Sequence, residues 1–97
     1  MSKLIEVCEL LSAANTSKRK YTLREVYINP EHVVSLHEAF SYEQKLLEGS
    51  LPEGLDQRQK FTRLTLNRGT SGLDIIIVGG PDMIENNLQK ERKVLHG

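Results

Sequence analysis

Three histidines and one cysteine are the side chains of this sequence best suited to hold a metal or attack a substrate. His32 and His37 are five residues apart along one predicted strand, so they should face opposite sides, and His96 lies near the C-terminus. No His-x-His or Cys-x-x-Cys spacing is present, so the sequence predicts no metal site. Cys8 is alone, without a disulfide partner or an identifiable base, and we predict that it is an inert core or half-buried residue.

Hydrolytic and phosphate chemistry find no support in the remaining polar residues. Ser71, Asp74 and His37 could be imagined as a triad, but no strained nucleophile turn or set of oxyanion donors accompanies them. The glycines of residues 69–72 lack the Gly-x-Gly-x-x-Gly spacing. Residues 79–81, between a predicted strand and a predicted helix, offer only the generic anion site of a helix start. We therefore predict no catalytic residue, no cofactor and no enzyme activity.

Basic residues suggest a second kind of function, the binding of nucleic acid. The chain has 13 basic and 13 acidic residues, so its zero net charge gives no electrostatic reason to expect strong binding to nucleic acid or to membranes. One basic cluster lies in the polar turn predicted for residues 12–20, and another flanks Phe61, without an interleaved aromatic pair. In this alternative the contact residues would be Lys18, Arg19, Lys20, Arg63 and Arg68.

The elements that would position these side chains form an α+β domain. We predict a small twisted antiparallel sheet of four or five strands with a C-terminal helix packed on one face, all in a single domain spanning residues 1–97. Residues 4–11 fit a helical stripe or a strand, and we favour a strand because Ile5 and Val7 are β-branched. The clearer strands are predicted at residues 21–28, 33–38, 61–66 and 73–78.

The end of the chain has the strongest local signals. Gly80 and Pro81 suit the first positions of a helix, and we expect the tail to fray from about residue 94. Residues 73–78 are apolar on nearly both faces, which indicates either a central strand or an edge that pairs with a second copy. The predicted core consists of Val26, Ile28, Val34, Leu36, Leu64, Leu66, Ile75, Ile77, Ile84 and Leu88.

An irregular insertion is predicted at residues 39–59. Ser41 and Gln44 match a capping box, so a short helix through Leu47 that ends at Gly49 is expected. A long connection of this kind either carries partner contacts or is a mobile, solvated excursion, and the sequence leaves both open. If it carries contacts, the residues that would touch a partner are Tyr42, Leu46, Leu47, Arg63 and Arg68.

From residue 27 onwards, the order of features resembles the small flagellar-operon proteins of the FlbD/SwrD type. The matching pieces are residues 27–34, residues 62–67, Gly72, and residues 76–78 followed by 81–85, about half of the chain. The insertion at residues 39–59 has no counterpart in that pattern. The resemblance implies a non-enzymatic module that acts by contact, and the same pattern would suit a small phage-encoded accessory protein.

The leading hypothesis is therefore a small accessory or regulatory protein that works through protein–protein contacts, as a homodimer if the strand at residues 73–78 pairs with a second copy. No apolar run approaches the ~18 residues of a membrane span, and the charged first residues do not form a signal peptide. With its lone cysteine, the chain is expected to be cytoplasmic.

Overall fold

The computed structural model describes the backbone of residues 2–10, 20–52, 54–68 and 71–96 and confirms the predicted α+β fold. Residues 4–11, for which the sequence allowed a helix or a strand and a strand was favoured, lie largely in the first of five strands. Along the chain the elements are β1 (Ser2–Leu10), β2 (Lys20–Ile28), the 3₁₀ turn η1 (Pro30–His32), β3 (Val33–Glu38), α1 (Phe40–Leu47), β4 (Phe61–Arg68), β5 (Ser71–Val78) and α2 (Pro81–His96).

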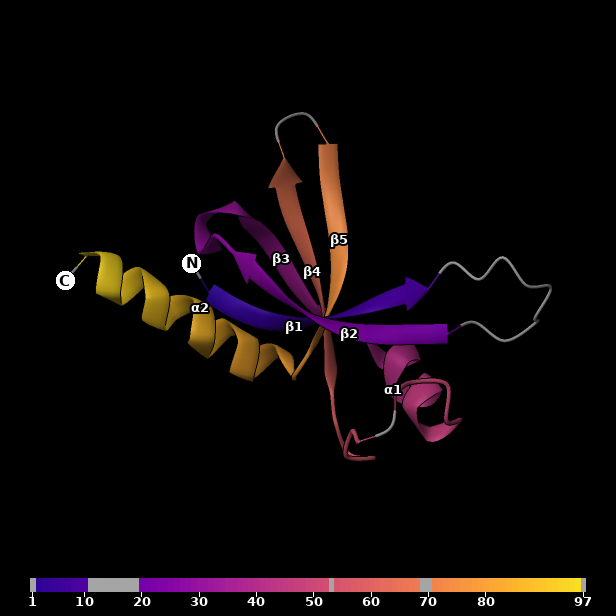
Figure 1. Ribbon diagram of the computed structural model, residues 1–97. Helices are drawn as coiled ribbons and strands as arrows, with labels where there is room; N and C mark the ends of the chain where they lie inside the picture. The colour runs from indigo at the N-terminus through magenta and orange to yellow at the C-terminus, as the bar shows by residue number, and fades with distance from the viewer. Residues whose placement is uncertain (1, 11–19, 53, 69–70, 97) are drawn as a thin grey trace.

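The five strands form one antiparallel sheet in the order β2-β1-β5-β4-β3. β1 and β2 pair along their whole length, and so do β4 and β5. Among the described residues, the strands of these two hairpins pair with each other at two positions, where Glu6 faces Ile77 and Val7 faces Ile76. Away from this crossing the hairpins diverge, so that β1–β2 runs nearly across β4–β5 (Figure 1).

β5 lies in the middle of the sheet, which resolves the two readings of its apolar sequence. Its side chains alternate between the two faces, and Ile75, Ile76 and Ile77 are all buried. Ile75 and Ile77 belong to one apolar cluster, whereas Ile76 belongs to another on the opposite face. β5 is therefore a central strand at Ile76 and Ile77, where a strand lies on either side, and its residues 75–77 are buried within one chain.

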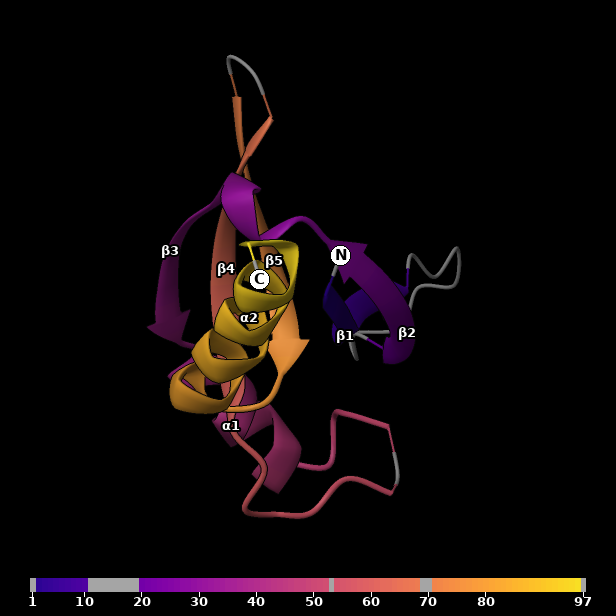
Figure 2. The ribbon, with the colours of Figure 1, turned by 90° about the vertical axis from the view of Figure 1, so that its left-hand side faces the viewer.

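The first core lies between the sheet and α2 (Figure 2). Ile84 and Leu88, one helical turn apart on α2, bury their side chains against Leu64 and Ile77 of the sheet. This is the C-terminal helix predicted on one face, and it begins at Pro81 as expected. The backbone of α2 is helical to His96, while the side chains from residue 91 onwards lie outside the described part of the chain.

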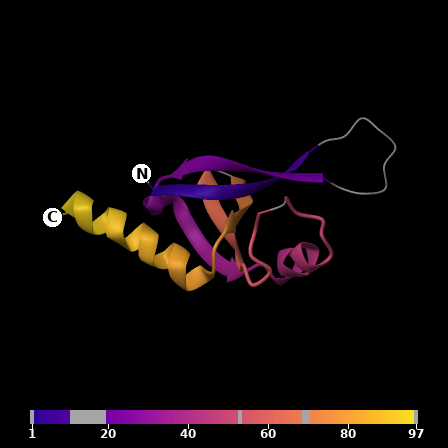
Figure 3. The same cartoon turned by 60° about the horizontal axis from the view of Figure 1, so that its bottom comes forward.

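A second core on the opposite face was not predicted. α1 and the segment that follows it cover this face, so the two helices lie on opposite sides of the β4–β5 hairpin (Figure 3). Leu51, from the insertion, is only 7% exposed, and the ring of Tyr42 lies edge-on to that of Tyr21 with centroids 5.9 Å apart. The buried residues of this cluster are Val7, Tyr21, Ala39, Leu51, Phe61 and Ile76.

Two local predictions are wrong for identifiable reasons. Val34, assigned to the core, is 65% exposed because the register of β3 against β4 shifts between Val33 and Ser35, so Val33 packs on the core instead. The capping box at Ser41 does not form: the N-cap of α1 is Ala39, two residues earlier, and it makes no side-chain cap bond. The helix does end as expected, at Gly49 with φ of 80°.

Candidate functional site

The candidate site is a pocket of about 500 Å³ between the two hairpins. This volume is within the range of ligand-binding pockets, about 300–1,000 Å³. None of its described lining residues comes from α2, so the helix leaves this part of the first core's face open. The apolar residues that line it are Val26, Ile28, Leu66, Leu73 and Ile75, and the polar ones are Glu6, Arg24, Tyr27, Asn29, His32, Asn67 and Asp74.

The crossing of the hairpins explains why a pocket forms here. Because only Glu6 and Val7 of β1 pair with β5, the strands separate beyond this point and their side chains cannot fill the space between them. Val26 and Leu66 pack against the first core at the bottom of this space. Leu73 and Tyr27, which are 39% and 60% exposed, leave apolar surface open to solvent beside it.

An ion pair lies at the crossing end of the pocket. The Nε of Arg24 donates a hydrogen bond of 3.2 Å to Oε1 of Glu6. The Glu6 side chain is 11% exposed, whereas that of Arg24 is 67% exposed, so the guanidinium links a buried carboxylate to solvent. This hydrogen bond and the Glu6 charge raise the pKa of Arg24 further, which keeps its guanidinium charged.

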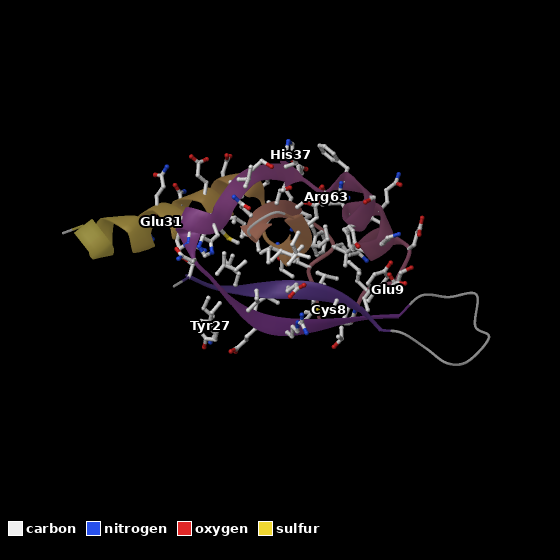
Figure 4. The ribbon with its side chains drawn as sticks, turned by 90° about the horizontal axis from the view of Figure 1, so that it is seen from above. Cys8, Glu9, Tyr27, Glu31, His37 and Arg63 are labelled. Atoms are coloured by element: carbon white, nitrogen blue, oxygen red, sulfur yellow. The ribbon has the colours of Figure 1, made fainter. Side chains whose placement is uncertain are left out.

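Cys8 lies on the same face of β1 as Glu6, two pairs further along the hairpin. It is half-buried, and Figure 4 shows its position on the hairpin. Burial raises the pKa of the Cys8 thiol, and the neighbouring Glu6 carboxylate raises it again, while Arg24 acts in the opposite direction. The protonated thiol is a weak nucleophile. The half-buried position agrees with the prediction from sequence.

The imagined triad of Ser71, Asp74 and His37 is not assembled. Asp74 accepts a 2.8 Å hydrogen bond from the hydroxyl of Thr65, and His37 lies on β3, two strands away from β5. The side chain of Ser71 lies outside the described part of the chain. Within the described residues, no group of three or more histidine, cysteine, aspartate or glutamate side chains could hold a metal ion.

The basic residues named from the sequence do not line this pocket. Arg63 is exposed on β4, opposite His37 of β3, and Figure 4 shows the two side by side. Arg68 and Lys20 lie at strand ends with side chains outside the described set, and Lys18 and Arg19 fall outside the described residues altogether.

The contact residues predicted on α1 separate into two groups. Tyr42 and Leu46 face the second core and pack against it, whereas Leu47 is 67% exposed. Phe40, about two helical turns before Leu47, is exposed to the same extent. Only Leu47 of the three α1 residues therefore presents most of its side chain to solvent.

The helix start at residues 79–81 is engaged with its own chain. The amide of Gly79 donates a 2.8 Å hydrogen bond to the carbonyl oxygen of Lys60, and the carbonyl oxygen of Gly80 accepts one of 3.1 Å from Ile84. The shallow depression beside Gly80 is lined by Asp56 as well as by Lys60, so it is not uniformly cationic. These contacts give the generic anion site no support.

Sequence reasoning missed the pocket, although one signal was present. Glu6 is a lone charge in the otherwise apolar run of residues 4–8. Arg24 lies directly opposite it on the next strand, so the two side chains are on the same face of the sheet. None of the described helices is long and apolar enough to cross a membrane.

Comparison of the chain with protein-family models, curated proteins and solved structures finds no match, so the resemblance to flagellar-operon proteins stays a prediction.

Proposed function

We propose that this protein is a non-enzymatic accessory module that holds part of a partner protein in the pocket between its two hairpins. The supporting observation is the aliphatic lining of that pocket, with Leu73 and Tyr27 left partly exposed beside it. Exposed apolar surface next to a concave site is typical of protein-binding surfaces. The contact role agrees with what the resemblance to flagellar-operon proteins implies.

The charges around the pocket favour a protein over nucleic acid. The one guanidinium in the described lining, that of Arg24, is already hydrogen-bonded to the carboxylate of Glu6, and the other charged lining residue, Asp74, is also acidic. Binding to a phosphate backbone needs several cations on one surface. The proposal also needs no second copy, because residues 75–77, the apolar stretch that suggested a homodimer, are buried within one chain. Formation of a homodimer stays a prediction.

A pull-down from host-cell lysate tests the proposal. Three forms of the chain are used as bait, and each is incubated with nuclease-treated and with untreated lysate. The wild type is compared with Leu73→Ser in the pocket and with Leu47→Ser, a matched loss of an exposed leucine on α1. We expect a defined protein partner that survives nuclease, is lost with Leu73→Ser and is kept with Leu47→Ser. Thermal melts of both variants establish that they are folded.

Two results would contradict the proposal. Capture that disappears with nuclease would favour the nucleic-acid alternative through Lys18, Arg19, Lys20, Arg63 and Arg68. Capture that is equal for Leu73→Ser and the wild type would place the contact surface outside the pocket.

A further inference from the structure

β5 has a free strand edge beside the pocket. On one side, β4 pairs with it over residues 71–78. On the other side, β1 pairs only with Ile76 and Ile77, so within the described residues the edge at 71–75 has no strand partner. Figure 1 shows this half of β5 standing clear of the β1–β2 hairpin. A strand edge presents unpaired N–H and C=O groups that can accept an added strand.

The free edge and the pocket share the same residues. Leu73, Asp74 and Ile75 belong to the unpaired stretch and also line the pocket. Leu73 and Ile75 lie on the face of the first core, whereas Asp74 points to the opposite face, because side chains alternate along a strand. A chain paired with this edge would therefore direct every second side chain into the pocket and the others towards the face of Asp74.

The two faces call for different side chains. The pocket offers Val26, Ile28 and Leu73, which suit an aliphatic side chain. On the opposite face, Asp74 accepts a hydrogen bond from Thr65 and forms no ion pair among the described residues. Its second carboxylate oxygen is available to a cation, since the residue is exposed.

We infer that the partner segment is an extended protein strand of alternating aliphatic and basic residues, which adds to β5 along residues 71–75. Main-chain hydrogen bonds to the free edge supply affinity, and the pocket and Asp74 select the alternating side chains. This inference rests on the proposed function, because it specifies the segment that occupies the same pocket.

The test uses the full ¹⁵N-labelled chain and a blocked heptapeptide of alternating lysine and valine. We expect saturable shifts of the backbone amides of residues 72–75 and slower hydrogen exchange there. A matched peptide with glutamate in place of lysine should bind at least about threefold more weakly, since its charges repel Asp74. Absence of saturable shifts, or equal binding of both peptides, would overturn the inference.

Backbone methylation separates strand addition from simple burial of side chains. One control peptide is N-methylated at its valines and another at its lysines, because only alternate amides of an added strand face β5. One of these two methylated peptides should lose its affinity for the chain, whereas the other should keep most of the affinity of the unmethylated peptide. Binding unaffected by either methylation would exclude strand addition.

Charge substitution tests the role assigned to Asp74. Asp74→Asn keeps an acceptor for Thr65 but removes the charge, and should weaken the lysine peptide about two- to fivefold, the effect of an exposed ion pair. Asp82→Asn, an exposed carboxylate on α2, should leave binding unchanged. Equal affinity of Asp74→Asn and the wild type would remove the basic residues from the inference.

The outcomes distinguish this inference from the proposed function. If Leu73→Ser loses its lysate partner but the peptide does not bind, the pocket keeps its role and the strand-addition inference fails. If Leu73→Ser captures the same partner as the wild type, the proposed function fails, and the inference with it.

Discussion

The hydroxyl of Thr62 donates a 2.7 Å hydrogen bond to the carbonyl oxygen of Gly79, and both residues are buried. The bond joins the start of β4 to the turn that leads from β5 into α2. The Gly79 amide reinforces this junction through its bond to Lys60. The position of α2 over the first core therefore depends on a polar contact as well as on apolar packing.

Replacing Thr62 by Val should destabilise the fold by about 1–3 kcal/mol, because it keeps the shape of the side chain but leaves a buried carbonyl oxygen without this donor. Urea unfolding followed by circular dichroism measures the change. Thr65→Val, which removes the exposed bond to Asp74, is the control and should cost less than about 1 kcal/mol. Equal losses in the two variants would contradict the role given to Thr62.

Gly79→Ala should be more destabilising than Gly54→Ala. Both glycines have positive φ, 128° and 97°, which costs an L-residue about 1–3 kcal/mol. At Gly54 a Cβ meets nothing within 4 Å, whereas at Gly79 it would overlap the Met83 side chain and approach Ile84 Cδ1 to 3.1 Å. Thermal unfolding of the two variants compares them, and similar melting temperatures would show that α2 moves away at little cost.

Glu43 should make the stability of the fold decrease as the pH rises. Its Oε2 is buried and has no donor in the described structure, and Glu38 lies beside it. Two ionised carboxylates cannot donate to each other, so the contact becomes a hydrogen bond only when one holds a proton. Burial and Glu38 thus raise the pKa of Glu43 above its ordinary value of 4.5, against the opposing effect of Lys60.

A raised pKa means that the folded chain binds more protons than the unfolded chain in the window above pH 4.5. The stabilisation is fully present below this window and is lost as the pH rises through it. Glu43→Gln should therefore be more stable than the wild type at pH 7 and lose that advantage by pH 4, as read from urea midpoints. Glu48→Gln, at an exposed position, serves as the control, and a pH-independent difference for Glu43→Gln would contradict the assignment.

Leu51→Ala should destabilise the fold by about 2–4 kcal/mol, since it removes a buried side chain from the second core. Leu47→Ala, on the exposed side of α1, should change the free energy of unfolding by no more than about 0.5 kcal/mol. Chemical unfolding of both variants decides whether the insertion is part of the cooperative fold. A small effect of Leu51→Ala would mean that residues 39–59 are dispensable for stability.

Strand and helix patterns predicted the elements of this fold because their signals are local. The Ile-rich β5 is recognisable from its own sequence, and Pro81 marks the start of α2. The second core was missed because it unites Val7, Tyr21 and Leu51 from distant segments. The bulge that exposes Val34 depends on the register against β4, which the sequence of β3 does not encode by itself.

The candidate site was harder to predict than the fold. It arises from the angle between two hairpins, and its lining residues are ordinary strand residues whose importance comes from where the hairpins separate. The basic residues that drew attention in the sequence lie elsewhere or outside the described chain. Only the pairing of Glu6 with Arg24 could have been inferred from phase along two neighbouring strands.

The contact between Glu6 and Ile77 joins segments roughly 70 residues apart, and such distant pairing slows the completion of a fold. During synthesis, at about 5–20 residues per second, the completed β1–β2 hairpin waits on the order of 2–10 s before its partner strand exists. In that interval Leu4 and Val7 have no core to enter. Apolar side chains exposed in this way favour aggregation or chaperone binding of a nascent chain, so the arrival of β5 ends the interval in which this one is exposed to both.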